Sequence, residues 1–371
     1  MVERRTPFYD IHVALGAEMI KGGGDFMFPK AYANPAEEHI NTRTNVGMQD
    51  LSTMGEVDIK GPGAETLVNR LLVNDVADMV SGQVRYSTMC REDGGVIDDV
   101  TVYKYNGQHF MIVTGSGPRK KSAQWIATNA SGAQAYVTDI TAAIALPVVQ
   151  GPRSREFLKT VVEEADLDSL EYFCFTKGRI GETEMIISRT GYTGELGYEL
   201  YTPAEEAAVL WETLLEKGHD FGLKAYGVLA MQTLRLEKAY ALYGNDLNEN
   251  YTPFHVGLDR WIKFDKGEFI GREALLRVRD EGAAERWVGL IIAGDKAAAF
   301  KDPIFAGREE VGYVTYSNKG HTVAKTLAMA YIKTAYTDPG TQLAVNIGDV
   351  PTTATVSSTP FFDPKGTRLR S

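Results

Sequence analysis

The chain contains only two cysteines among its 371 residues. Cys90 and Cys174 form no disulfide framework, so we expect free thiols in a reducing compartment. The six histidines show no ligand spacing with cysteine or carboxylate residues, and we therefore predict no metal site. The sequence also lacks a Walker loop, a GxGxxG motif after a strand and a GxSxG elbow, which removes common signatures of nucleotide binding and serine hydrolysis.

Long apolar runs and excess positive charge are missing as well. The longest apolar runs, residues 144–149 and 288–292, have the length of core strands and are too short to cross a membrane. Lys and Arg number 39 against 49 Asp and Glu, which gives a net charge of -10. This balance argues against nucleic acid and anionic membranes as partners, although it allows a small anionic ligand. Residues 1–5 lack the apolar segment of a secretory signal, so we expect a cytoplasmic protein.

The length and the pattern of apolar residues indicate more than one domain. At 371 residues the chain exceeds the size at which a single hydrophobic core stops growing. Helical and strand patterns alternate up to about residue 278, whereas the residues beyond Glu281 have the pattern of short strands and turns without a long helix. We therefore predict an α+β fold with a β-rich unit at the C-terminal end.

Two adjacent acids lie in an otherwise apolar strand pattern at residues 96–103, which follows a turn at residues 93–95. Because side chains alternate along a strand, Asp98 and Asp99 must point in opposite directions, and Asp99 shares its face with Tyr103. A carboxylate among apolar neighbours costs free energy unless it is paired, solvated or used. Taken alone, the pattern leaves a strand-edge role and a chemical role equally open for either acid.

A second acid follows a glycine turn. Residues 191–194 form the turn and residues 198–200 return as a strand, with Glu199 on the face opposite Tyr198 and Leu200. Such a carboxylate can accept two parallel N–H bonds from a planar heterocycle, while an aromatic residue of the turn, Tyr192, stacks or hydrogen-bonds. An ordinary hairpin with a solvent-facing glutamate gives the same pattern and is the simpler interpretation of this segment alone.

Both segments belong to an ordered set of motifs that runs through nearly the whole chain. The set consists of RTPF (5–8), VGM (46–48), DLSTMGE (50–56), GGVIDD (94–99), QGP (150–152), SRTGYTGE (188–195), LRLE (234–237), YGND (243–246) and FDKGEFIGREAL (264–275). Each motif is weak by itself, but the set in this order and spacing resembles the folate-dependent aminomethyltransferase (glycine cleavage T-protein) superfamily.

The resemblance implies a three-domain ring around a central channel that binds tetrahydrofolate. It assigns residues 1–278 to a folate-binding region of two interleaved α+β domains, the second at roughly 55–140, and residues 279–371 to a barrel-like domain. The essential aspartate of the family falls on Asp99, and the glutamate that holds the pterin falls on Glu199. Its folate-lining aromatic positions correspond to Tyr86, Tyr103, Tyr192 and Tyr240.

Several family motifs are altered in this chain. Gln49–Thr53 reads QDLST where the family usually has FDVSH, and Leu229–Gln232 reads LAMQ in place of GARD, which removes an arginine used around folate. The asparagine loop after the third strand is replaced by residues 115–117, and the SGxFSP signature by residues 316–321. The acids expected around folate are kept, whereas the residues expected on the donor side change.

This contrast favours a paralogue with a different one-carbon donor. We expect a demethylase that moves a methyl group from a small O-, S- or N-methylated substrate to tetrahydrofolate. One alternative is the aminomethyltransferase of glycine cleavage, which requires a lipoyl-carrier protein as partner. A second alternative is a non-catalytic folate-binding assembly factor, although the Lys-Gly-Cys motif of such relatives is absent. Gln49, Thr53 and His255 are donor-side candidates by position, and each also has a simple structural interpretation.

Overall fold

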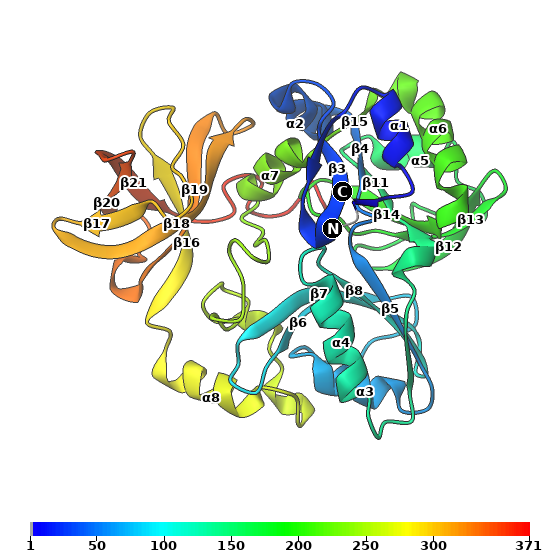
Figure 1. The fold of residues 1–371 in the computed structure, drawn as a ribbon, viewed down its shortest axis with the longest axis horizontal. Coiled ribbons are helices and arrows are strands. Elements are labelled where there is room, and N and C mark those ends of the chain that lie inside the picture. The colour runs from blue at the N-terminus through cyan, green and yellow to red at the C-terminus, as the bar shows by residue number, and fades with distance from the viewer. Residues whose placement is uncertain (1–2) are drawn as a thin grey trace.

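Three units make up the computed structural model, which describes residues 3–371. Figure 1 shows them as a large sheet with helices, a smaller sheet with helices below it, and a barrel to one side. The closed barrel lies at the C-terminal end and is formed by strands alone. This arrangement confirms the α+β fold with a β-rich C-terminal unit that the sequence predicts.

The first unit is built on a seven-stranded sheet of order β12-β13-β14-β11-β4-β15, with β10 paired to β14. Its strands are β4 (Val46–Asp50), β10 (Ile144–Ala145), β11 (Pro147–Gln150), β12 (Phe175–Ile180), β13 (Thr183–Ser188), β14 (Gly197–Pro203) and β15 (Leu223–Ala225). A three-stranded sheet near the N-terminus consists of β1 (Arg4–Arg5), β2 (Glu18–Lys21) and β3 (Phe26–Ala31).

Five helices belong to this unit: α1 (Tyr9–Ala14), α2 (Pro35–Thr44), α5 (Ser154–Leu158), α6 (Ala207–Gly218) and α7 (Val228–Glu237). Helix α2 begins where the Asn34 side chain accepts a hydrogen bond from the backbone N–H of Ala36, as N-cap residues do. Helix α6 buries Ala207, Leu210, Trp211 and Leu214, which recur at the spacing of one helix face.

The second unit is a five-stranded sheet of order β6-β7-β8-β5-β9. It comprises β5 (Gly55–Lys60), β6 (Val84–Cys90), β7 (Val96–Asn106), β8 (His109–Thr114) and β9 (Tyr136–Asp139), with helices α3 (Ala64–Leu71) and α4 (Arg119–Asn129). Val100 and Val102 of β7 pack in one cluster with Leu67 of α3 and Ile126 of α4. The opposite face of β7 is therefore turned away from these helices.

That opposite face packs against the first unit. Tyr103 of β7 and Met111 of β8 share a buried cluster with Val148 of β11 and Tyr201 of β14. Because β4 precedes the five-stranded sheet in the chain and β11 to β15 follow it, the two units are interleaved in sequence. This interleaving brings β7 and β14 together, although about a hundred residues separate them in the sequence.

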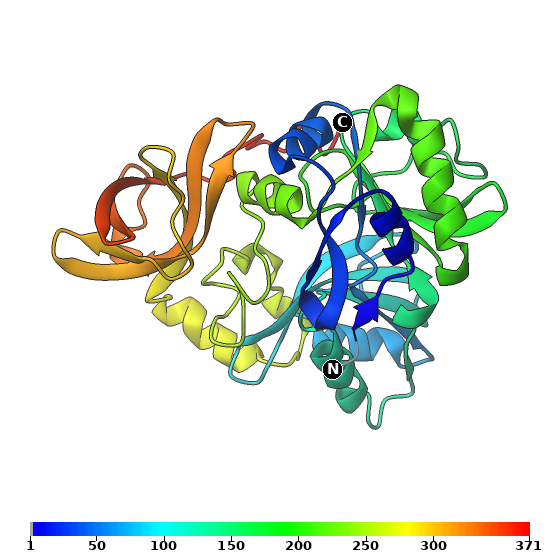
Figure 2. The same cartoon turned by 45° about the horizontal axis from the view of Figure 1, so that its top comes forward.

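The third unit is a closed barrel of order β16-β19-β18-β17-β20-β21. Its strands are β16 (Glu285–Ile292), β17 (Pro303–Ala306), β18 (Glu309–Gly320), β19 (Lys325–Lys333), β20 (Gln342–Ile347) and β21 (Val350–Ser357), and α8 (Arg272–Glu281) precedes them. Helix α7 of the first unit packs against β18 and β19. The segment after β21 returns to the first unit, where Arg368 contacts Glu195, and Figures 1 and 2 show the C-terminus beside that unit.

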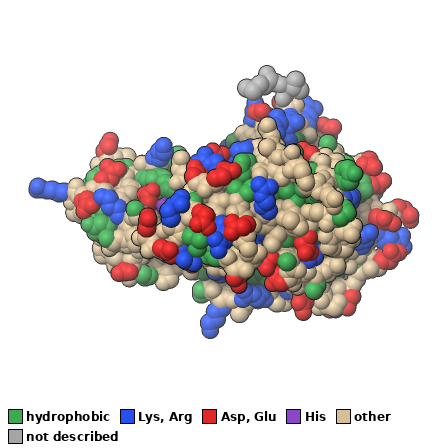
Figure 3. All heavy atoms as spheres, turned by 90° about the horizontal axis from the view of Figure 1, so that it is seen from below, with side chains coloured by type: hydrophobic (Ala, Val, Ile, Leu, Met, Phe, Trp, Pro, Cys, Tyr) green, Lys and Arg blue, Asp and Glu red, His purple; other side chains and the backbone are tan. Residues whose placement is uncertain are grey.

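Acidic and basic side chains are interspersed over the surface that Figure 3 shows. In the part of the chain that the structure describes, no helix combines the length and the apolarity needed to span a bilayer. Within residues 3–371, no group of three or more His, Cys, Asp or Glu side chains is arranged to hold a metal ion.

Candidate active site

The two adjacent acids of β7 have separate environments, as their alternation predicts. Asp98 is fully buried on the side of α4, and its Oδ2 accepts hydrogen bonds from Ser122 Oγ (2.6 Å) and the Gly115 backbone N–H (3.1 Å). Asp99 lies on the opposite face, remains partly exposed, and accepts a hydrogen bond from Tyr86 Oη at 2.9 Å. Asp98 thus anchors the start of α4, while Asp99 is the acid that a ligand can reach.

Burial affects the protonation of both acids. It raises the pKa of Asp99 to about 6, and the hydrogen bond from Tyr86 opposes this shift. The pKa of Asp98 is raised well above its usual value, first by burial and then by the negative charge of Asp99. Of the two acids, Asp99 is therefore the one whose pKa lies close to neutral pH.

Glu199 of β14 is buried and oriented by two tyrosines. Its Oε2 accepts hydrogen bonds from Tyr201 Oη (2.8 Å) and Tyr103 Oη (3.2 Å). Burial raises the pKa of Glu199, and the hydroxyls of Tyr201, Thr190 and Tyr103 oppose that shift by stabilising the ionised form. Since both tyrosines bind the same oxygen, they hold the carboxylate in one orientation.

Tyr103 connects the two acids. It extends from the same face of β7 as Asp99, four residues further along, and its hydroxyl reaches Glu199 on β14. Four residues of extended strand span about 13 Å, which is the distance along β7 between Asp99 and Tyr103. The sequence predicts that Tyr103 lines the folate, but its side chain is fully buried. Packing between the two sheets places it behind Glu199, where it positions that acid.

Three other predicted aromatic residues, Tyr86, Tyr192 and Tyr240, keep partial exposure. Tyr192 Oη donates to the backbone oxygen of Ala241 at 2.6 Å, and its ring lies 5.8 Å from that of Tyr240 at an angle of 30°. Burial raises the pKa of both Tyr86 and Tyr192, and the negative charge of Asp99 raises it further. The structure therefore places Tyr86 against Asp99 and Tyr240 beside Tyr192.

Two family models match this chain. The model of the GCVT N-terminal domain matches residues 8–266, and that of the glycine cleavage T-protein C-terminal barrel domain matches residues 286–363. The chain belongs to the glycine cleavage T-protein family. Enzymes of this family are folate-dependent one-carbon transferases, and so is this protein. The resemblance found in the sequence motifs is thereby confirmed.

Relatives of the same length support the assignment. The aminomethyltransferase of Halothermothrix orenii is 38% identical over 359 residues, which are 97% of this chain and 100% of the relative. That of Moorella thermoacetica is 39% identical over 359 residues, with 97% and 98% covered. The crystal structure of the glycine cleavage system aminomethyltransferase T from Bartonella henselae superposes with a TM-score of 0.92 at 26% identity, over 98% of this chain and 99% of that chain.

Two family motifs meet in one buried ion pair. Arg235 of the LRLE motif and Asp246 of the YGND motif are fully buried, with Nη1 and Oδ2 2.5 Å apart. The Arg235 guanidinium lies 4.5 Å from the ring centre of Tyr316 on the barrel strand β18. Its positive charge also acts on Tyr192, where it opposes the rise in pKa caused by burial. The pair therefore connects α7 with the barrel, and its charge reaches Tyr192.

The three residues predicted on the donor side, Gln49, Thr53 and His255, lie in different parts of the structure. Gln49 of β4 pairs in register with Val148 of β11, which in turn pairs with Glu199 of β14, so Gln49 and Glu199 lie in one row across the sheet. Thr53 Oγ1 lies 2.7 Å from Ser116 Oγ and connects two loops. His255 Nδ1 lies 2.9 Å from Thr252 Oγ1, and the His255 backbone oxygen accepts from the barrel strand β16. The contacts of His255 are thus with the barrel junction and do not include Asp99 or Glu199.

Two residues of the site, Tyr201 and Trp261, are not predicted from the sequence. Tyr201 orients Glu199 and lies two positions away on the same strand face, so strand periodicity could have indicated it. Trp261 packs edge-on against Tyr86 with ring centres 5.9 Å apart. No local pattern marks Trp261, because its loop reaches Tyr86 only through the tertiary fold.

Glu199→Gln tests the predicted pterin clamp. We expect the dissociation constant for tetrahydrofolate to rise about 10- to 100-fold, since an amide replaces a charged acceptor of N–H bonds. Titration of intrinsic fluorescence measures this change. Glu184→Gln, at an exposed position of β13, is the matched control and should bind like the parent protein. Unchanged affinity in the Glu199 variant would refute the assignment.

Proposed function

We propose that this protein is an aminomethyltransferase, which takes a one-carbon unit from an aminomethyl group on a lipoyl-carrier protein and passes it to tetrahydrofolate with release of ammonia. The support for this donor is that relatives named aminomethyltransferase, at 34–39% identity, match nearly the whole chain. Because of these relatives, methyl transfer from a small methylated donor, which the altered motifs predict, is the second candidate function. The support for the acceptor comes from the two acids of the site.

The arrangement of Asp99 and Glu199 on facing sheets is the observation that carries the proposal. One oxygen of the Glu199 carboxylate is fixed by two tyrosine hydroxyls, and a carboxylate held in this way suits the planar N–H edge of a pterin. Tyr192 and Tyr240 have partly exposed rings 5.8 Å apart and can confine a flat ring system. The residues present therefore fit a reduced folate.

The chemical role of Asp99 follows from its surroundings. Tetrahydrofolate supplies the nucleophilic nitrogen when it is bound. Asp99 faces the site as the partly exposed acid, and Tyr86 fixes its Oδ2 through a 2.9 Å hydrogen bond. An ionised carboxylate at this place orients an N–H group and stabilises positive charge that develops on nitrogen. Partial burial of Asp99 lowers the local dielectric and strengthens this interaction.

A direct assay tests the donor. The purified protein is incubated with tetrahydrofolate and an aminomethylated lipoyl-carrier protein, and methylenetetrahydrofolate and ammonia are quantified. We expect both products in equal amounts. Parallel reactions contain sulfonium, methoxy-aromatic or methylamine compounds instead of the carrier and are analysed for methyltetrahydrofolate. Absence of product from the carrier would refute the proposal.

Gln49 favours methyl transfer as a second candidate function. This residue replaces the phenylalanine of the family motif and lies in one row with Glu199 across three strands, so the change is close to the proposed ligand. Methyltetrahydrofolate formed from a small methylated compound, without product from the carrier, would establish this candidate. Folate binding without product from any donor would instead indicate the non-catalytic alternative.

A further inference from the structure

Lys266, in the segment before α8, has its charged end enclosed by oxygen atoms. Its Nζ donates to the backbone oxygens of Leu72 (2.6 Å), Asn74 (2.7 Å) and Asn69, and the side-chain oxygen of Asn69 lies 3.2 Å away. Asn69 and Leu72 lie at the C-terminal end of α3, where carbonyl groups lack partners within the helix and the helix dipole favours a cation. We call the three backbone oxygens the carbonyl cage. An ammonium group has three N–H donors, so one donor is available for each of them.

Asn74 connects the carbonyl cage to β6. Its side-chain Nδ2 donates to the backbone oxygen of Tyr86 at 2.9 Å, and its backbone N–H donates to Ser87 Oγ at 3.0 Å. Asn74 and Ser87 are buried, and a buried polar group that loses its partner costs free energy. Lys266 therefore acts on the backbone of Tyr86 through a single intervening residue.

The segment that carries Lys266 also supports the ring of Tyr86. The backbone N–H of Lys263 donates to the backbone oxygen of Val73 at 2.9 Å, so this segment runs beside the residues of the carbonyl cage. Trp261 of the same segment packs edge-on against Tyr86, with ring centres 5.9 Å apart. Tyr86 is thus supported at its backbone and at its ring, and Lys266 joins the two segments that provide these supports.

Tyr86 in turn contacts the acid of the candidate active site. Its Oη donates to Asp99 Oδ2 at 2.9 Å, and this contact depends on the position of β6 and of the Tyr86 ring. We propose that Lys266 is a positioning residue for the transfer reaction: it fixes both supports of Tyr86 and thereby keeps the Tyr86 hydroxyl on Asp99. The inference rests on the role of Asp99 under the proposed function.

A double-mutant cycle tests whether Lys266 acts through Tyr86. Tyr86→Phe removes the hydroxyl, and we expect kcat to fall about 10-fold. Lys266→Met keeps the aliphatic stem but removes the N–H donors, and we expect kcat to fall about 5-fold. Because both changes act on the same hydrogen bond, the double variant should stay within about twofold of Tyr86→Phe, whereas independent effects would multiply to about 50-fold. Tetrahydrofolate and the aminomethylated lipoyl-carrier protein are the substrates of this assay.

Two further measurements do not depend on the size of kcat. The Tyr86 hydrogen bond opposes the rise in the pKa of Asp99 that burial causes, so the pH midpoint of kcat/KM should move above about 6 in both single variants. Loss of stability alone would not produce this shift. In the folate-free protein, the peptide that contains Asn74 should exchange its amide hydrogens faster in Lys266→Met than in the parent.

Lys104→Met is the matched control. Lys104 Nζ also donates to backbone oxygens between α3 and β6, those of Val76 (3.2 Å) and Ala77 (3.4 Å), and it pairs with Glu65. These contacts do not include Asn74. The control variant should therefore melt at a lower temperature than the parent, but it should keep the parent kcat and pH midpoint at temperatures where it is folded.

The outcomes separate the role of Lys266 from the proposed function. Lys266→Gln keeps two N–H donors for the carbonyl cage and replaces Lys266→Met in the cycle if that variant does not fold. Parent kcat and pH midpoint in the Lys266 variant, effects that multiply in the double variant, or unchanged exchange at Asn74 would overturn the positioning role and leave the proposed function intact. A parent protein without product from the carrier, or without the rise in kcat/KM near pH 6, would refute the proposed function and this inference with it.

Discussion

Asp99→Asn is expected to reduce turnover by about 10²- to 10⁴-fold while tetrahydrofolate still binds within a few-fold of the parent affinity. The amide has the shape of the acid and can keep the contact with Tyr86 Oη, but it cannot carry the negative charge that stabilises a developing cation. Single-turnover assays measure the rate, and fluorescence titration measures binding. Near-normal turnover in this variant would refute the role of Asp99.

The pH dependence provides a second readout for Asp99. Burial raises its pKa to about 6, so kcat/KM should rise as pH increases through about 6 and the carboxylate ionises. The Asn variant should lack this rise. Asp98→Asn is the control on the opposite face of β7, where the acid is anchored to Ser122 and Gly115, and it should keep the rise near pH 6.

The raised pKa of Asp99 also predicts that its ionisation lowers the stability of the folded protein. The folded state binds the Asp99 proton more tightly than the unfolded chain, whose value is near 3.8. Ionised Asp99 therefore destabilises the folded protein at pH above about 6. This destabilisation disappears below pH 3.8, where the acid is protonated in both states. We expect Asp99→Asn to melt at a higher temperature than the parent at pH 8 in the absence of folate. A lower melting temperature at pH 8 would contradict this account.

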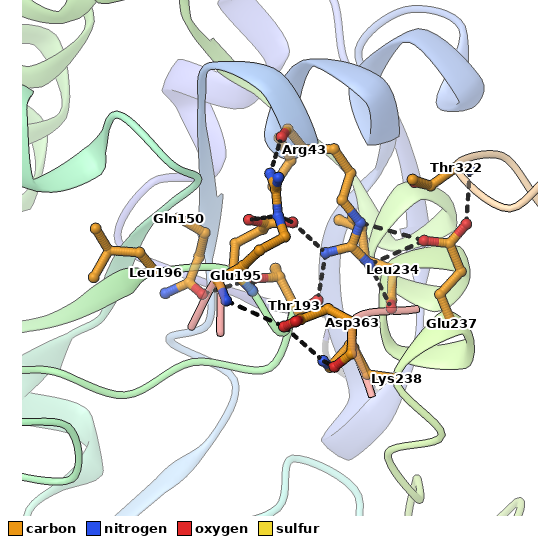
Figure 4. Close-up of polar contacts among 12 residues, drawn as sticks. Arg43, Gln150, Thr193, Glu195, Leu196, Leu234, Glu237, Lys238, Thr322 and Asp363 are labelled. Atoms are coloured by element: carbon orange, nitrogen blue, oxygen red, sulfur yellow. Dashed lines mark hydrogen bonds and ion pairs between the residues drawn. The ribbon is translucent and has the colours of Figure 1, made fainter. Parts of the chain in front are cut away.

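Arg43→Met is expected to destabilise the protein by about 3–5 kcal/mol, because it leaves buried carboxylates without their cation. Figure 4 shows Arg43 of α2 between Glu195 and Glu237, and its side chain is nearly fully buried. Nη1 donates to Glu195 Oε1 (3.0 Å) and the Thr193 backbone oxygen (2.8 Å). Nη2 donates to Glu237 Oε2 (3.1 Å) and the Leu234 backbone oxygen (3.1 Å).

The electrostatics around Arg43 explain the size of this effect. Burial by itself would raise the pKa of Glu237, but His39 and Arg43 outweigh it and hold the pKa at about 2. Glu237 therefore stabilises the folded state above the unfolded value of 4.5, and this contribution is lost as pH falls through about 2. At Glu195 burial outweighs the opposing effect of Arg43 and Arg368, and the pKa is raised. Removing Arg43 therefore leaves Glu195 and Glu237 as buried acids with fewer partners.

Thermal and denaturant unfolding measure the loss. Arg153→Met is the matched control, because Arg153 pairs with Glu156 at an exposed site, and it should change stability by less than about 1 kcal/mol. Adding Glu195→Gln and Glu237→Gln to the Arg43 variant should recover part of the loss, since the two buried carboxylates that lost their cation are then neutral. An Arg43 variant as stable as the parent would show that the buried ion pairs do not contribute to the free energy of unfolding.

The Arg43 cluster also supports the site. Arg368 of the C-terminal segment contacts Glu195 and the Arg43 backbone oxygen, and Asp363 pairs with Lys238 directly after α7. Figure 4 shows Asp363 and Lys238 beside each other and close to Glu195. Tyr240 follows α7 by only a few residues, so the cluster fixes the segment that carries this tyrosine. Loss of Arg43 should therefore weaken folate binding at temperatures where the protein remains folded.

Local patterns in the sequence determined several features of this protein. The alternation of β7 placed Asp98 and Asp99 on opposite faces, and the glycine turn before β14 marked Glu199. The ordered motifs identified the family and the barrel at the C-terminal end. These features depend on side-chain periodicity and turn chemistry within a few residues, which the sequence states directly.

The tertiary structure alone decided which distant residues meet. It buried Tyr103 and brought its hydroxyl to Glu199, aligned Gln49 with Glu199 across three strands, and placed His255 beside the barrel strand β16. It also placed Trp261 against Tyr86 and surrounded Arg43 with acids from separate segments. Burial, strand pairing and ion pairs between distant segments depend on how the three units pack, and no local pattern encodes that packing.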